Sequence, residues 1–119
     1  MSGGSVAATY RFNIDQGTTV KRTLRWLRDG LPVDLTGASA RMEIRTAVGG
    51  TLLHRLDTTN GGLTLGPDGT ILIKIAPDVT TAWTAQSGVY DLEVVDSAGQ
   101  VTRLIQGQVS ISPEVTTGV

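Results

Sequence analysis

Short segments in which apolar and polar residues alternate recur along most of the chain, and glycine-containing turns separate them. The clearest of these segments places Ala40, Met42 and Ile44 on one side and charged residues on the other. Successive side chains of a β-strand point to opposite faces, so this period of two indicates strands with one buried and one solvated face. The chain is therefore predicted to be built mainly from β-strands.

About eight strands are predicted from this pattern and from the turn signals between the segments. Their expected ranges are 9–14, 18–28, 38–45, 51–57, 63–65, 70–76, 89–95 and 100–112. One short helix is expected at 77–83, which opens with a proline. Short strands at regular spacing are typical of immunoglobulin-like domains. The predicted fold is all-β, an immunoglobulin-like antiparallel β-sandwich of about eight strands with one short helical turn.

The length of 119 residues suits one domain. We expect a flexible N-terminal arm over 1–8, a β-sandwich domain over 9–112 and a C-terminal tail over 113–119. The sequence has no cysteine, which excludes a disulfide scaffold, a thiolate metal site and a cysteine nucleophile. It has no secretion-signal pattern and no run of roughly 20 apolar residues that could cross a bilayer, so we expect a soluble protein.

The charge of the chain is nearly balanced, with ten basic and eleven acidic residues and a net charge of −1. Proteins that bind nucleic acid usually carry a basic surplus, and the surface of this chain is also poor in aromatic rings for stacking on bases. We therefore expect neither a nucleic-acid partner nor a membrane partner.

Few residues could act in catalysis. His54 is the only histidine, and its place in a short strand favours a surface or partly buried structural role over that of a base. Asp91 and Glu93 would share a strand face about 7 Å apart. We interpret them as part of a solvated face, with Glu93 close to Arg103 on the next strand. The expected protein is not an enzyme and has no catalytic residues.

The aspartates and the two tryptophans are the residues that could form a metal site or a sugar site. The aspartates lie singly in turns, where local hydrogen bonds explain them, so we expect no metal and no cofactor. Trp26 is expected in the core with Val20 and Leu24. Trp83 is expected to cap one end of the sandwich. With its neighbouring loops, Trp83 also supports an alternative interpretation as a carbohydrate-binding or adhesion module.

The two chain ends are the candidate partner-binding segments. No contact within the domain is predicted to require them, and such arms can become ordered on a neighbour, for example by adding a strand to an exposed sheet edge. Plain disorder of these ends is the alternative. The residues assigned to partner contacts are Ser2, Gly3, Gly4, Ser5, Val6, Glu114, Val115, Thr116 and Thr117.

A series of turn and strand motifs follows a recognisable order over about residues 9–113. Its most specific part is Pro-Val-Asp-Leu-Thr-Gly at 32–37, followed by the strand Arg-Met-Glu-Ile-Arg at 41–45. The other motifs lie at 15–18, 60–65, 68–71, 88–94, 99–103 and 107–113. This order resembles small immunoglobulin-like β-sandwich structural proteins of tailed bacteriophages. It is similar to the N-terminal domain of the phage baseplate upper protein.

The resemblance implies a structural component of a phage virion, made in the cytoplasm of the host bacterium. Such modules dock on other virion proteins of the tail, baseplate, portal, collar or capsid, often as homo-oligomeric rings or trimers, and some anchor a receptor-binding protein. The long C-terminal extension of the baseplate protein is missing from this sequence, so an adaptor or collar module and a capsid-decorating protein are both open. The family supplies no catalytic residues.

Overall fold

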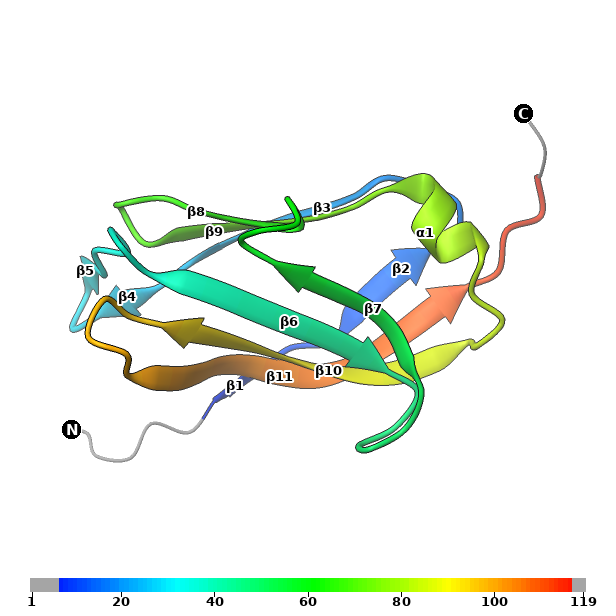
Figure 1. Ribbon diagram of the computed structural model, residues 1–119. Coiled ribbons are helices and arrows are strands. Elements are labelled where there is room, and N and C mark those ends of the chain that lie inside the picture. The colour runs from blue at the N-terminus through cyan, green and yellow to red at the C-terminus, as the bar shows by residue number, and fades with distance from the viewer. Residues whose placement is uncertain (1–6, 117–119) are drawn as a thin grey trace.

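The alternating segments form strands whose apolar sides meet between two facing β-sheets (Figure 1). A computed structural model describes residues 7–116 of the chain. Its elements are β1 (Ala8–Thr9), β2 (Phe12–Asp15), β3 (Val20–Arg25), β4 (Leu27–Arg28), β5 (Leu31–Pro32), β6 (Ser39–Arg45), β7 (Leu52–Asp57), β8 (Leu63–Leu65), β9 (Thr70–Ile75), α1 (Pro77–Thr81), β10 (Ser87–Val95) and β11 (Val101–Ser112).

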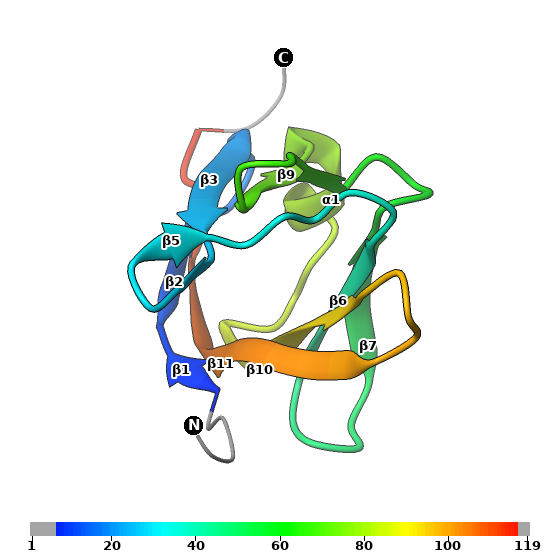
Figure 2. The same ribbon diagram turned by 90° about the vertical axis from the view of Figure 1, so that its left-hand side faces the viewer.

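The larger sheet has the order β1-β11-β10-β6-β7, and β2 lies along β11 beyond β1. Its central strands pair antiparallel, whereas β1 and β2 run parallel to β11. The smaller sheet has the order β3-β9-β8. Figure 2, turned by 90° from Figure 1, shows β3 and β9 on one side of the core and β10 and β11 on the other. This arrangement confirms the predicted all-β, immunoglobulin-like sandwich.

The structure also agrees with the predicted number of about eight strands, provided that β1 and β2 are counted as one strand. β1 and β2 are two parts of one interrupted strand along β11, and β4 and β5 form a separate two-stranded hairpin at one end of the sandwich. Setting that hairpin aside, eight strands make up the two sheets within residues 7–116. The single helix, α1, begins at Pro77 and is as short as expected.

The core is mostly aliphatic and draws on both sheets. Ile44 and Leu92 from the larger sheet and Ile71 from the smaller sheet have no exposed surface at all. Aromatic side chains fill the end near β2, where the ring centroids of Phe12 and Tyr90 lie 4.7 Å apart in an edge-on arrangement. Edge-on packing is favourable for aromatic rings, so this contact adds to the burial of both side chains.

The interruption between β1 and β2 corrects one prediction. The alternation predicted over 9–14 places Tyr10 on the same side as Phe12 and Ile14, but Tyr10 is 44% exposed while the other two are buried. The chain comes very close to β11 here, since a β-carbon on Gly107 would lie 2.2 Å from the carbonyl oxygen of Tyr10. The backbone N–H of Tyr10 donates to the carbonyl of Gln106, and its carbonyl accepts the Tyr90 hydroxyl at 2.6 Å.

The pairing of β10 with β11 has its register shift between Leu92 and Glu93, and Gly107 lies in regular register opposite Tyr90. One further expectation was wrong in detail. Trp26 was expected in the core, but β3 ends at Arg25 and Trp26 is only half-buried at the edge of the core. The Arg28 guanidinium lies 5.2 Å from the centroid of the Trp26 ring, which places a cation over its accessible face.

Candidate interaction surfaces

The outer face of the larger sheet carries five ion pairs among the described residues. It consists of alternate residues of β6, β7, β10 and β11, whose neighbours in each strand point into the core. The pairs are Arg41–Glu93 (2.8 Å), Arg45–Glu43 (2.8 Å), Arg55–Glu43 (2.9 Å), Arg55–Asp57 (3.1 Å) and Arg103–Asp91 (3.5 Å). Four arginines and four carboxylates therefore compensate one another, and we call this set the charge lattice.

Hydrogen bonds within the lattice favour the ionised form of two of its carboxylates. Hydrogen bonds from Arg45 and Arg55 lower the pKa of Glu43. The hydroxyl of Thr59, together with backbone N–H groups and Arg55, lowers the pKa of Asp57 to about 2. The same hydrogen bonds raise the pKa of Arg55, so these three groups stabilise one another as ions.

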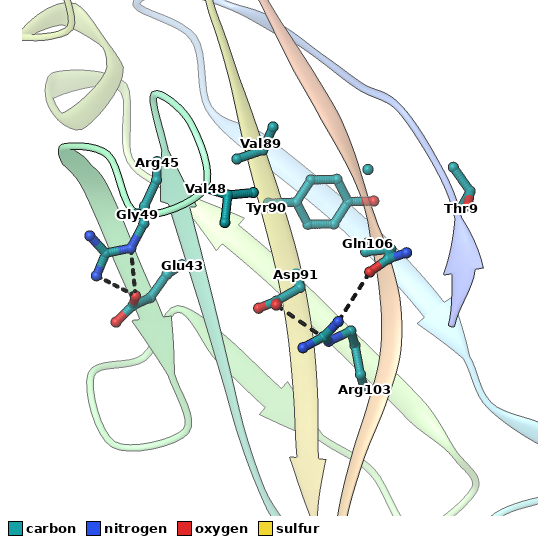
Figure 3. A pocket seen from close by; sticks show the side chains of 11 residues that line it. Thr9, Glu43, Arg45, Val48, Gly49, Val89, Tyr90, Asp91, Arg103 and Gln106 are labelled. Atoms are coloured by element: carbon teal, nitrogen blue, oxygen red, sulfur yellow. Dashed lines mark hydrogen bonds and ion pairs between the residues drawn. The ribbon is translucent and has the colours of Figure 1, made fainter. Parts of the chain in front are cut away.

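A groove of about 480 Å³ crosses this outer face (Figure 3). It runs from Thr9 on β1 to Val48 and Gly49 in the loop between β6 and β7, and its lining includes Arg45 and Arg103. Figure 3 shows Val48 above the sheet, with the Arg103 side chain between Asp91 and Gln106. The charged groups of the groove thus have partners within the protein.

The side chains that line the groove include two hydroxyl groups and two carboxylates. The hydroxyl groups among its lining residues belong to Thr9 and Tyr90. Tyr90 donates its hydroxyl proton to a backbone carbonyl, and its burial, with a contribution from Tyr10, raises its pKa. The carboxylates in the lining are those of Glu43 and Asp91, and both are held in ion pairs with arginines.

A second surface lies at the opposite end of the sandwich from α1, on the β4–β5 hairpin (Figure 1). Asp29 and Gly30 form its turn with φ angles of 53° and 77°, as a two-residue hairpin requires. Leu27 is 49% exposed and Leu31 is 69% exposed. Leu27 pairs with Pro32 and Leu31 pairs with Arg28, so the two leucines lie on opposite faces of the hairpin.

Most of the partner-binding residues predicted from the sequence lie outside the described range, namely Ser2, Gly3, Gly4, Ser5, Val6 and Thr117. Val115 is 94% exposed and Thr116 is exposed, so both are accessible to a partner. Glu114 behaves differently, because its backbone N–H donates to the side-chain oxygen of Gln16 at 3.0 Å. The first part of the C-terminal tail is therefore attached to the domain.

Gln16 is a connecting residue that the sequence analysis missed. Its Nε2 donates to the carbonyls of Thr80, Thr81 and Trp83 at 3.1, 3.3 and 2.8 Å, which connects the turn after β2 to the end of α1 and the residues that follow it. Its oxygen holds Glu114, as described above. The sequence contained one hint of this role. Asp15 and Gly17 are common turn residues, whereas the long amide side chain of Gln16 between them is not needed to form a turn.

The charged residues singled out from the sequence belong to the charge lattice. Asp91 and Glu93 lie on the outer face as predicted, and Glu93 is the Cα partner of Arg103. However, Glu93 also lies directly opposite Arg41 of β6, and the ion pairs differ from the expected contact. Glu93 pairs with Arg41, and Arg103 pairs with Asp91.

His54 is half-buried on β7, where burial lowers its pKa. No group of three histidine, aspartate, glutamate or cysteine side chains within residues 7–116 is arranged to hold a metal ion.

Trp83 is 7% exposed and forms part of the core beside α1. A sugar-binding tryptophan presents the face of its ring to solvent, and this ring does not. The alternative of a sugar platform at Trp83 therefore has no support in the geometry.

Comparison of the sequence with protein-family models gives no match, and comparison with curated proteins gives none either. Within residues 7–116, no helix has the length and apolar character needed to cross a membrane.

Proposed function

We propose that the protein is a non-enzymatic structural component of a tailed-phage virion, an adaptor that docks on other virion proteins of the tail, baseplate or collar. The phage setting rests on the resemblance of the turn and strand motifs to phage sandwich proteins. The immunoglobulin-like fold agrees with that resemblance, although many unrelated proteins share this fold.

The β4–β5 hairpin is the observation that carries an adaptor role. Leu27 and Leu31 are exposed on its two faces, at one end of the sandwich. A hairpin with apolar side chains on both faces can insert between neighbouring subunits, and exposed apolar surface of this kind marks protein contacts. Such a contact is compatible with a ring or trimer of identical copies.

The first experiment is quantitative mass spectrometry of purified particles of the phage that encodes the protein. We expect a copy number that is a multiple of three, six or twelve relative to the portal, as a ring or trimer requires. The multiple also assigns the protein to the tail, the collar or the capsid. Absence from particles, with abundant protein in the lysate, contradicts the proposed function.

A second experiment tests the hairpin. The double variant Leu27→Ser and Leu31→Ser should leave the sandwich folded, because both side chains are exposed, and should lower the copy number in particles. Leu52→Ser is the matched control, since Leu52 is 43% exposed on β7 and lines neither the hairpin nor the groove. Incorporation of the double variant at the wild-type copy number contradicts a role of the hairpin in docking.

The chain ends are proposed as further contacts and are tested by deletion of residues 2–6 together with 115–119. This variant keeps Glu114 and its hydrogen bond to Gln16, so the described fold should be retained. Loss of incorporation with an unchanged circular dichroism spectrum is the expected result. Unchanged incorporation contradicts the assignment of partner contacts to these ends.

A further inference from the structure

The outer face of the smaller sheet differs in charge from the rest of the surface. Lys21 on β3 and Lys74 on β9 are direct cross-strand neighbours, and both side chains are exposed. They point away from the core, since Val20 and Ile75 next to them in the strands are buried. Arg25 extends the cationic face towards the far end of β3, where its Nε donates to the carbonyl of Asp68.

The two lysines differ from the arginines of the charge lattice in their pairing with carboxylates. All five ion pairs within residues 7–116 lie on the larger sheet, and neither Lys21 nor Lys74 takes part in one. Like charges placed directly opposite each other on a sheet destabilise it. The smaller sheet thus carries a cost in the isolated domain that a negatively charged partner would remove.

We propose that the outer face of the smaller sheet, centred on Lys21 and Lys74, is a docking surface for an acidic surface of a partner protein. Charge complementarity identifies the partner's chemistry. The half-buried Leu72 between polar residues on this face adds a small apolar contact. A protein surface fits better than nucleic acid, because a pair of lysines is a small cationic site compared with the basic surplus typical of nucleic-acid binders, and the strands of this face carry no aromatic ring for stacking.

The cationic docking face rests on the proposed function only in assuming a protein partner. The virion role is tested on purified particles, whereas the docking face is tested on the purified protein with defined ligands. Each proposal can therefore be contradicted without the other.

The first test of the face measures stability. Lys74→Glu places a carboxylate opposite Lys21 and should raise the thermal midpoint by about 1–5 °C. Arg11→Glu, which makes the same change of two charge units at an exposed cation outside this sheet, is the control for net charge. An unchanged or lower midpoint for Lys74→Glu relative to this control shows that the lysine pair carries no strain and overturns the proposal.

The second test measures binding of a synthetic peptide of ten glutamates by isothermal titration calorimetry at low salt. The double variant Lys21→Gln and Lys74→Gln should bind about two- to thirtyfold more weakly than the wild type. The double variant Arg41→Gln and Arg103→Gln makes the same change in net charge on the other sheet and should bind like the wild type.

Equal losses in the two double variants mean that net charge alone governs peptide binding, which overturns the proposal. A DNA duplex that binds more tightly than the peptide, and loses its binding only when the lysines are replaced, also overturns it and assigns the face to nucleic acid. Peptide binding that depends on the lysine pair and exceeds DNA binding is the supporting result.

Discussion

The two sheets of the sandwich are alike on their inner faces and different on their outer faces. Inside, both supply fully buried aliphatic side chains, such as Leu92 and Ile73. Outside, the larger sheet compensates its charges within the charge lattice, whereas the smaller sheet places Lys21 opposite Lys74. The inner faces therefore account for the fold, and the outer faces are where the molecule can distinguish one partner from another.

The largest effects should come from the inner faces, and they should be equal in the two sheets. Leu92→Ala and Ile73→Ala should each lower the free energy of unfolding by about 2–5 kcal/mol, because both side chains are buried and leave a cavity. Urea denaturation measures both. A cost below about 1 kcal/mol for Ile73→Ala alone would show that the smaller sheet is only loosely packed on the larger one.

A large effect confined to the larger sheet is expected at the interruption between β1 and β2. Gly107→Ala places a β-carbon against the Tyr10 carbonyl oxygen, so β1 and β11 must separate. We expect a loss of about 2–4 kcal/mol in the free energy of unfolding. Gln108→Ala, the next residue on the same strand, is exposed and serves as the control. Equal stability of the two variants would contradict the close approach.

A smaller effect should follow from Tyr90→Phe. The variant keeps the ring packed on Phe12 but leaves the Tyr10 carbonyl without the hydroxyl that binds it. We expect a loss of about 1–2 kcal/mol. A matched change in the smaller sheet, Thr23→Val at an exposed position, should be nearly neutral. If Tyr90→Phe is also neutral, the hydroxyl does not hold the first strand in place.

The smallest predicted effect is a pH dependence that belongs to the larger sheet. Glu43 and Asp57 have lower pKa values in the folded protein than in the unfolded chain, so the folded state releases their protons more readily. The stability that these two ionised carboxylates give to the folded state is fully present above the ordinary glutamate pKa of 4.5. It is lost as the pH falls towards about 2.

Glu43→Gln should therefore reduce the fall in thermal midpoint between pH 5 and pH 2. Asp29→Asn, which changes a turn carboxylate outside the charge lattice, is the control. An identical acid response of the wild type and Glu43→Gln would mean that solvent screens the lattice completely.

The alternation of side chains predicted the strands well where one side of a strand faces the core throughout. The segment 38–45 is the clearest case, since its inward residues Ala40, Met42 and Ile44 are buried in β6. The pattern failed at Tyr10 and Trp26, which lie where a strand is interrupted or ends. Periodicity reports the conformation of one strand, and it contains no information about a neighbouring backbone that forces a break.

The candidate surfaces could be predicted only in part. That Asp91 and Glu93 form a solvated face followed from strand periodicity, but their ion-pair partners depend on which strands lie beside β10, and Glu93 pairs with Arg41 of β6. The contact of Gln16 with α1 and Glu114 joins residues more than 60 positions apart, and no local pattern specifies such a contact. Exposure of Leu27 and Leu31 likewise follows from the position of their hairpin at the end of the sandwich.

The parallel pairing of β1 and β2 with β11 has a mechanical consequence. The chain enters the domain at the start of β1 and leaves it at the end of β11, and these points lie at opposite ends of the paired strands (Figure 1). Tension applied between the two chain ends therefore acts along the strands and loads their hydrogen bonds in shear. Bonds loaded together must break together, so the domain should resist stretching more strongly than a sandwich whose end strand can be peeled away one bond at a time.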